Sequence, residues 1–150
     1  MTTTVLLVRH GETDAAREDR FNGRSDVPLN LHGIKQAEWL AAGLKQTNIE
    51  ACYFSPLSRC METARLIVGL RPVPIQIAPF LIESDYGDWE QLPREEISLK
   101  YADAWNRWEM DPAGIAPPNG ESGYQIAARV LPFFWEVVQR WEGKTILMVA

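Results

Sequence analysis

Short apolar runs recur at four places along this 150-residue chain. Residues 4–8, 51–55 and 144–150 are apolar, contain β-branched residues and are flanked by charged or turn-forming residues, so they predict buried strands. Residues 73–78 alternate only weakly and contain prolines, which cannot donate to a ladder. That segment therefore predicts a short strand near a sheet edge.

Helix signals separate these predicted strands. Asn30 is a good N-cap for a helix over residues 31–46, in which apolar residues recur at helical spacing. Ser55 and Pro56 are the cap and the first residue expected of a second helix, and Gly69 can end it. Strands that alternate with helices in this way are typical of an α/β fold with a mostly parallel sheet.

The segment between residues 73–78 and the last predicted helix breaks the alternation. Residues 94–109 predict a helix rich in tryptophan, and a proline-rich loop follows it. We expect this region to lie over the carboxyl edge of the sheet and to roof a pocket there. Ser122 then caps a long helix to about Trp141, in which Pro132 predicts a kink or a local break.

Composition narrows the class of protein. The apolar content of 46% and the charged content of 23% are typical of a soluble globular protein, and the length suits one domain over residues 1–150. A net charge of −5 argues against nucleic-acid binding. Neither a membrane-spanning run nor a signal pattern occurs, and Cys52 and Cys60 predict free thiols. We therefore expect a cytoplasmic protein with no nucleic-acid or membrane partner.

The first predicted strand ends in Arg9, His10 and Gly11. In open α/β sheets, ligands bind at the carboxyl ends of the strands, and Gly11 allows a sharp turn without a side chain that would block an incoming group. The Arg9 guanidinium disfavours protonation of the adjacent imidazole and can also grip a phosphate with two bonds. A strand-end histidine with no special role is the alternative. The other histidine, His32, is expected at the surface.

Further candidate groups follow the second and third strands. Arg59 lies in the first turn of a predicted helix, where a cation is unfavourable but an anion binds well, so its position suggests a function; a solvated charge is the alternative. Four acids, Glu83, Asp85, Asp88 and Glu90, compete for the role of a proton donor. Glu83 directly follows apolar residues, and a carboxyl in apolar surroundings is held more easily in its protonated form.

The stretch Leu7-Val8-Arg9-His10-Gly11-Glu12-Thr13 resembles the signature of the histidine phosphatase superfamily, also called phosphoglycerate mutase-like. Residues 20–29, 55–64 and 81–90 resemble further blocks of the same superfamily. The resemblance implies a three-layer α/β sandwich in which helices cover both faces of a mostly parallel sheet. It also implies an enzyme that transfers a phosphoryl group onto His10 and then onto water or another hydroxyl.

The resemblance also implies roles for individual residues. His10 is the nucleophile, Glu83 the acid and base ahead of its three competitors, and Arg9 and Arg59 neutralise charge on the phosphoryl group. Asn22 and Gly23 fall where the family contacts phosphate or substrate, as do Arg9, Arg59 and Glu83. No metal or cofactor is implied, and the expected partner is a small phosphorylated metabolite. A homodimer remains open.

The chain departs from the family pattern at two places. Ala16 stands where many members carry an asparagine that donates to the phosphate. The sequence ends at Ala150, where the family's next residue is a second histidine. We therefore expect the domain to be incomplete at its carboxyl end and to belong to a protein of roughly 200 residues.

Within the superfamily, the middle of the chain is most similar to the α-ribazole phosphatases. Those enzymes dephosphorylate α-ribazole 5′-phosphate during cobalamin biosynthesis. Three alternatives stay open at this point: a broad-specificity phosphomonoesterase, a cofactor-dependent phosphoglycerate mutase, and a non-catalytic phosphate binder.

Overall fold

A four-stranded parallel sheet forms the centre of the computed structural model, which describes all residues 1–150. Its strand order is β1-β4-β2-β3, so the last strand in sequence lies between the first two. The four apolar runs supply these strands, and β3 is an edge strand with all its residues exposed, as its prolines predicted. The strands are β1 (Thr4–Val8), β2 (Ala51–Phe54), β3 (Ile75–Ile77) and β4 (Thr145–Val149).

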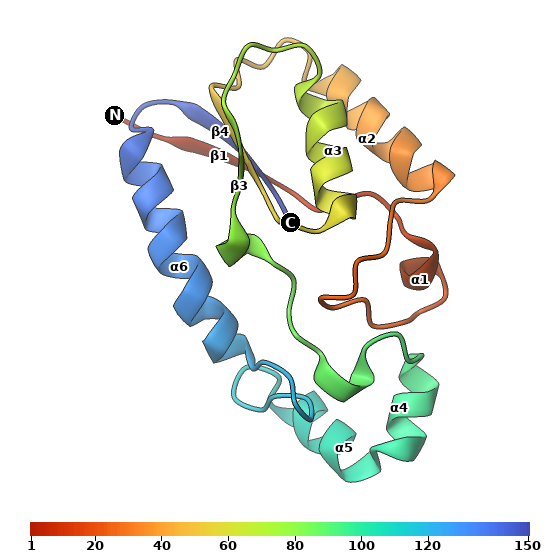
Figure 1. Cartoon of the computed structure of the whole chain (residues 1–150). Coiled ribbons are helices and arrows are strands. Elements are labelled where there is room, and N and C mark those ends of the chain that lie inside the picture. The colour runs from red at the N-terminus through yellow and green to blue at the C-terminus, as the bar shows by residue number, and fades with distance from the viewer.

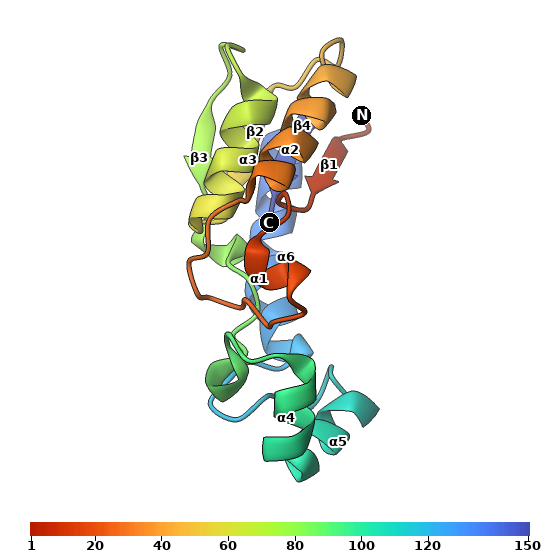
Figure 2. The same cartoon turned by 90° about the vertical axis from the view of Figure 1, so that its right-hand side faces the viewer.

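Helices cover both faces of the sheet (Figures 1 and 2). On one face, α2 (Leu31–Gly43) packs against α3 (Ser58–Val68), and α6 (Gly123–Arg140) covers the other. Side chains alternate along β4: Leu147 and Val149 face the first helix pair, while Ile146 and Met148 face α6. The predicted three-layer α/β architecture is therefore confirmed.

The predicted start of α3 is wrong. The helix begins at Ser58 with Leu57 at the N-cap position, and Ser55 caps nothing. The Ser55 N–H donates to the Val149 carbonyl at 2.9 Å, so the chain is still extended along β4 at that point. Gly69 does end the helix, with a φ of 57° that suits glycine. The preceding helix, α2, also stops at Gly43, earlier than the predicted residue 46.

A short helix that was not predicted follows Thr13, and two further segments differ from their predictions. This helix, α1 (Asp14–Arg17), begins there because the Thr13 hydroxyl accepts from the Ala16 N–H. The single helix expected over residues 94–109 is two helices that meet at Tyr101, whose φ of −121° is not helical. The break predicted at Pro132 is absent, and α6 continues through it. Packing of its flanking residues on the sheet stabilises the uninterrupted helix.

The two helices of that split segment, α4 (Arg94–Lys100) and α5 (Ala102–Met110), lie beyond the carboxyl ends of the strands, as predicted (Figure 1). They enclose a third hydrophobic cluster around Trp89, separate from the two that flank the sheet. Phe21 exchanges backbone hydrogen bonds with Gln91 and Leu92, which ties the loop after α1 to this cluster. The structure contains no helix that combines the length and the apolar character needed to cross a bilayer.

Candidate active site

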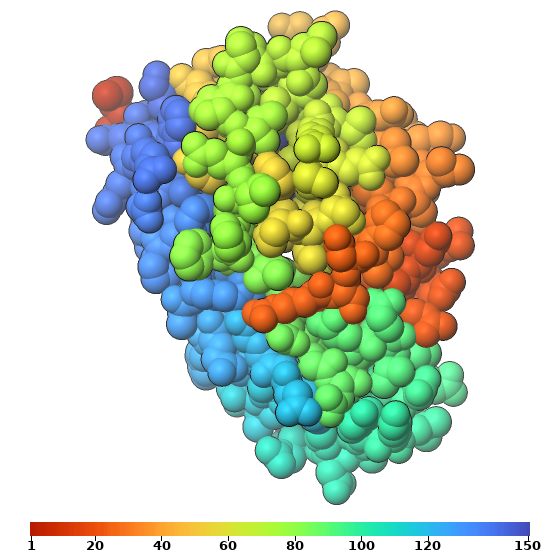
Figure 3. Space-filling model, in the orientation of Figure 1, coloured from red at the N-terminus to blue at the C-terminus, as the bar shows by residue number.

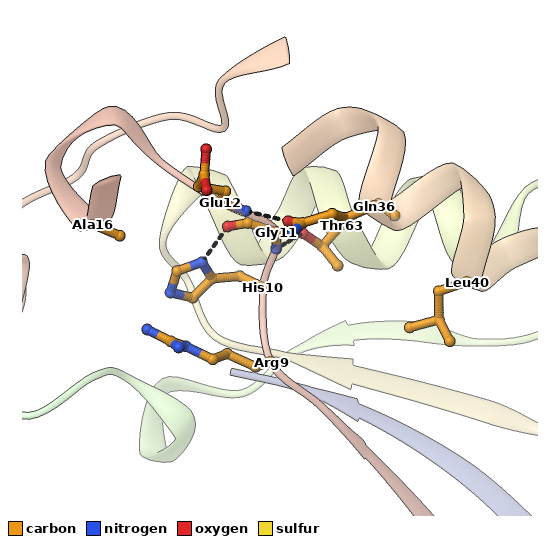
Figure 4. A pocket seen from close by; sticks show the side chains of 9 residues that line it. Arg9, His10, Gly11, Glu12, Ala16, Gln36, Leu40 and Thr63 are labelled. Carbon is orange, nitrogen blue, oxygen red and sulfur yellow. Dashed lines mark hydrogen bonds between the residues drawn. The ribbon is translucent and has the colours of Figure 1, made fainter. Parts of the chain in front are cut away.

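His10 lies immediately beyond β1, where its backbone N–H donates to the Ala150 carbonyl at 2.9 Å. The imidazole is buried, and its Nδ1 lies 2.7 Å from the Gly11 carbonyl oxygen (Figure 4). A carbonyl only accepts hydrogen bonds, so Nδ1 carries the proton and the lone pair is on Nε2. The backbone therefore selects the tautomer in which Nε2 is a nucleophile.

The electrostatic surroundings of His10 keep its ring neutral. Burial lowers the pKa of His10 below its ordinary value, and the nearby Arg59 and Arg9 guanidiniums lower it further. The bond to Gly11 and the Glu83 carboxylate act in the opposite direction without reversing the shift. At pH 7 the ring is consequently uncharged and available to attack an electrophile.

We predict that His10 titrates below pH 6.5. The ring is neutral above its lowered pKa, so its lone pair is lost only as the pH falls through that value. For the same reason its contribution to folding stability is present above about pH 6.5, the unfolded value, and disappears as the pH falls through the folded pKa. Proton NMR of the imidazole resonances measures this directly, and a His32→Ala variant identifies which of the two signals is His10. A midpoint above 6.5 would contradict the neutral nucleophile.

Two glycines allow α2 to approach the end of β1. A Cβ on Gly11 would lie 2.3 Å from the Gly33 carbonyl oxygen, and a Cβ on Gly33 would lie 2.2 Å from the backbone carbonyl oxygen of Glu12. On the other side, the Gly11 N–H donates to the Thr63 hydroxyl at 3.1 Å, which in turn donates to the Arg59 carbonyl at 2.7 Å. The turn that carries His10 is thus fixed between α2 and α3.

Arg59 is a fully buried cation, with 0% of the residue exposed. Its two terminal nitrogens donate to the Gly23 and Ser25 carbonyls at 2.8 and 2.9 Å, and its Nε–H has no partner. No carboxylate lies within ion-pair distance of it. A buried charge without a counter-ion is costly, and an anion bound beside His10 would compensate it.

Five of the six predicted site residues line one cavity of about 190 Å³. These are Arg9, His10, Asn22, Gly23 and Glu83. Arg59 is the exception: it does not line the cavity, but lies behind the Gly23 loop and holds that loop in place.

The groups that line this cavity include unsatisfied polar atoms. The Arg9 guanidinium forms none of the ion pairs of the structure. Asn22 donates to the Thr13 hydroxyl at 2.8 Å, while its Oδ1 is buried without a partner. Arg9 and His10 also line an adjoining cavity of about 490 Å³, in which Ala16 takes the position of the expected asparagine (Figure 4). A cation beside a neutral imidazole in such a cavity suits a phosphate ester.

The four competing acids have different positions. Only Glu83 lines the cavity with His10. Asp85 pairs with Arg24 at 3.2 Å, and Asp88 accepts from Asn119 at the surface. Glu90 accepts from the backbone N–H groups of residues 24 and 25 at 2.7 and 2.8 Å, so it fixes the same loop that Arg59 holds. His32 is exposed and packs against Trp39, away from the cavity.

Sequence reasoning missed several residues that shape the site. Thr63 follows Arg59 by four residues on one helical face, a spacing that could have identified it. Tyr86 and Arg94 also line the cavity, and Arg94 lies over the Phe21 and Trp105 rings at 5.5 and 5.3 Å. No local signal points to Arg94, because its position depends on how α4 packs against the loop after α1.

Comparisons with known proteins agree with this geometry. The family model described as histidine phosphatase superfamily (branch 1) matches residues 5–150. The adenosylcobalamin/α-ribazole phosphatase of Salmonella typhimurium is 37% identical over 144 residues, covering 96% of this chain and 71% of that protein. Phosphoserine phosphatase 1 of Hydrogenobacter thermophilus is 32% identical over 97% of this chain and 69% of its own length. The crystal structure of the α-ribazole phosphatase from Shigella flexneri superposes with a TM-score of 0.90 at 32% identity, covering 97% and 72% of the two chains.

Proposed function

Because the chain belongs to branch 1 of the histidine phosphatase superfamily and is a phosphoric monoester hydrolase, we propose that it dephosphorylates α-ribazole 5′-phosphate through a phosphohistidine on His10. The observation that carries the catalytic part is the His10 ring. It is buried, held with its proton on Nδ1, and surrounded by two guanidiniums and one carboxyl group. That arrangement provides a nucleophile, charge neutralisation and a proton donor in one place.

In the first step, Nε2 of His10 attacks the phosphorus of the monoester. The bond from phosphorus to Nε2 forms as the bond to the ester oxygen breaks. Arg9, which lines the cavity, neutralises charge on the equatorial phosphoryl oxygens, and the buried charge of Arg59 acts on them from behind the Gly23 loop. The Glu83 carboxyl group transfers its proton to the departing alkoxide, so an alcohol leaves and Glu83 becomes a carboxylate.

In the second step, water attacks the phosphorus of the phosphohistidine. Glu83 accepts a proton from that water, the bond to Nε2 breaks, and inorganic phosphate is released. The imidazole regains its lone pair and Glu83 regains its proton. The net reaction is hydrolysis of a phosphomonoester, with no consumption of a cofactor.

The choice of α-ribazole 5′-phosphate rests on two kinds of support. Relatives whose names state α-ribazole phosphatase activity match almost the whole chain. In addition, Phe21 and Tyr86 present aromatic surface at the cavity that holds His10. Aromatic side chains of this kind stack favourably on a flat heteroaromatic base.

A broad-specificity phosphomonoesterase is a second candidate. The relative named phosphoserine phosphatase 1 matches this chain at 32% identity, nearly the level of the relatives named α-ribazole phosphatase. Phosphoserine and α-ribazole 5′-phosphate share only a primary alkyl phosphate. A site that serves both would recognise the phosphate and little else.

We predict that kcat/KM is at least about tenfold higher for α-ribazole 5′-phosphate than for phosphoserine or p-nitrophenyl phosphate, because a site complementary to the ribazole moiety uses binding energy that the other substrates lack. A phosphate-release assay over this panel measures the preference. Similar values across the panel would favour the broad-specificity enzyme. Conversion of 3-phosphoglycerate only after priming with 2,3-bisphosphoglycerate would instead identify a mutase.

We further propose a cytoplasmic location, with a small phosphorylated metabolite as partner. Both cysteines are free and buried, and burial raises the pKa of Cys52 to about 12 and that of Cys60 to about 11. Such thiols are unreactive. Two unpaired cysteines suit a reducing compartment.

A further inference from the structure

A largely buried ion pair between Arg129 of α6 and Glu121, which precedes that helix, contacts the segment that carries Glu83 at several points. Arg129 binds Glu121 in a bidentate manner, with Nε and Nη2 at 2.8 and 2.9 Å from its two carboxylate oxygens. The side chains are only 17% and 12% exposed. A bidentate geometry of this kind is among the strongest that two charged side chains form.

The same guanidinium also binds the backbone around Glu83. Its Nη1 donates to the Phe80 carbonyl at 2.6 Å, and its Nη2 donates to the Glu83 carbonyl at 3.3 Å. Its partner Glu121 binds the far end of the segment, because its carboxylate accepts from the Asp85 N–H at 3.4 Å and its own backbone N–H donates to the Asp85 carbonyl at 2.8 Å. One ion pair therefore holds the start, the middle and the end of residues 80–85.

The Glu83 side chain has no comparable anchor of its own. Its only hydrogen bond is to the adjacent Ser84 N–H, at 2.8 Å. Since this bond moves with the local backbone, the position of the carboxyl group relative to His10 depends on what holds residues 80–85 in place. The Arg129–Glu121 pair contacts the backbone of this segment at residues 80, 83 and 85, and so adds polar anchors to the core packing of Leu81 and Ile82.

The ion pair also reaches the phosphate side of the site. Arg24, which follows Gly23, lies 3.2 Å from Asp85 and 3.6 Å from Glu121. Figure 3 shows the loop after α1, in orange, lying across the green segment that follows β3. Arg24 thus joins the Gly23 loop to the Glu83 segment through Asp85 and through Glu121, the acid that it shares with Arg129.

We propose that Arg129, together with Glu121, is the positioning residue that aligns the Glu83 carboxyl group for proton transfer to the leaving group. This inference rests on the proposed role of Glu83. It assigns a task to a side chain that touches neither substrate nor His10. Glu121 remains ionised in this role, since the hydrogen bond from Arg129, followed by the charges of Arg129 and Arg24, lowers its pKa.

Leaving groups of different basicity test the proposal. An alkoxide needs a proton to depart, whereas p-nitrophenolate does not, so only the alkyl ester depends on Glu83 before the phosphohistidine forms. We expect Arg129→Lys to lower kcat/KM for α-ribazole 5′-phosphate, or for phosphoserine if that ester is the better substrate, by about 10- to 100-fold. The value for p-nitrophenyl phosphate should change by less than about threefold. Lysine keeps the charge but cannot form the four hydrogen bonds of the guanidinium.

Two reference variants complete the experiment. Glu83→Gln should show the same dependence on the leaving group, and adding Arg129→Lys to it should cause no further loss. Arg140→Lys alters an exposed pair on the same helix, with Glu136, and should leave both substrates unaffected. If Arg129→Lys proves unfolded by circular dichroism, Glu121→Gln replaces it with the same expected result.

The outcomes distinguish failure of the positioning role of Arg129 from failure of the proton-donor role of Glu83. If Arg129→Lys lowers kcat/KM equally for the alkyl ester and for p-nitrophenyl phosphate, while Glu83→Gln lowers it mainly for the alkyl ester, the positioning role alone is overturned. Equal losses on both substrates in Glu83→Gln would instead overturn the role of Glu83 within the proposed function. A loss confined to the alkyl ester in both variants supports the proposal.

Discussion

Replacing His10 with alanine is expected to lower kcat/KM for every phosphomonoester by about 10⁴-fold or more. The variant lacks the atom that becomes phosphorylated, and no second imidazole and no thiol lines the same cavity as Arg9, Asn22 and Glu83. The fold should persist, because the ring makes one hydrogen bond and that bond is to its neighbouring residue. Circular dichroism and a phosphate-release assay on the same preparation measure both effects.

The other histidine provides a matched control. His32 is exposed, lies against Trp39 in a T-shaped arrangement and lines neither cavity beside His10, so His32→Ala should retain nearly full activity. Comparable losses in the two variants would show that neither ring is the nucleophile and would refute the assignment of His10.

Replacing Arg59 with methionine is expected to lower kcat/KM by about 10²–10³-fold, the effect typical of losing one preorganised charge donor. Methionine fills much of the same volume without the charge, so the comparison isolates the guanidinium. Two effects on stability oppose each other in this variant. The Gly23 and Ser25 carbonyls lose their donors, while a buried cation without a counter-ion disappears.

The effect of inorganic phosphate on the melting temperature tests whether the charge of Arg59 contributes to anion binding. A ligand present at 100 times its Kd stabilises the folded state by about 2.7 kcal/mol. We expect inorganic phosphate to raise the melting temperature of the wild-type protein but not that of Arg59→Met. Arg65→Met, at an exposed position on the same helix, should keep the phosphate response. A response that survives in Arg59→Met would contradict the role of this cation.

Local patterns in the sequence were sufficient to predict the strands and the starts of three of the six α-helices, α2, α4 and α6. Apolar runs marked all four strands, and Asn30 and Ser122 marked the starts of α2 and α6 through real capping bonds. Ser55 misled because a serine before a proline is equally compatible with a strand that continues along β4. Tyr101 could not have been identified as a helix break, since its conformation depends on aromatic packing in the cluster around Trp89.

The site was predictable where its chemistry lies in one short segment. Arg9, His10 and Gly11 are consecutive, and their position after a strand already indicated a ligand site. The burial of Arg59 behind the Gly23 loop was not predictable, because its partners are 34 and 36 residues away in the sequence. The contacts of Arg129 were not predictable for the same reason, because they join it to residues 80–83, which are 46 residues or more away in the sequence.

The central claim is that a phosphoryl group becomes covalently attached to His10. Rapid acid-free quenching of the wild-type protein during turnover of a ³²P-labelled substrate, followed by peptide mapping, tests it most directly. We predict acid-labile, base-stable label on the peptide that contains His10 and none in His10→Ala. Label on any other residue, or turnover with no labelled protein at the earliest times, would contradict the account.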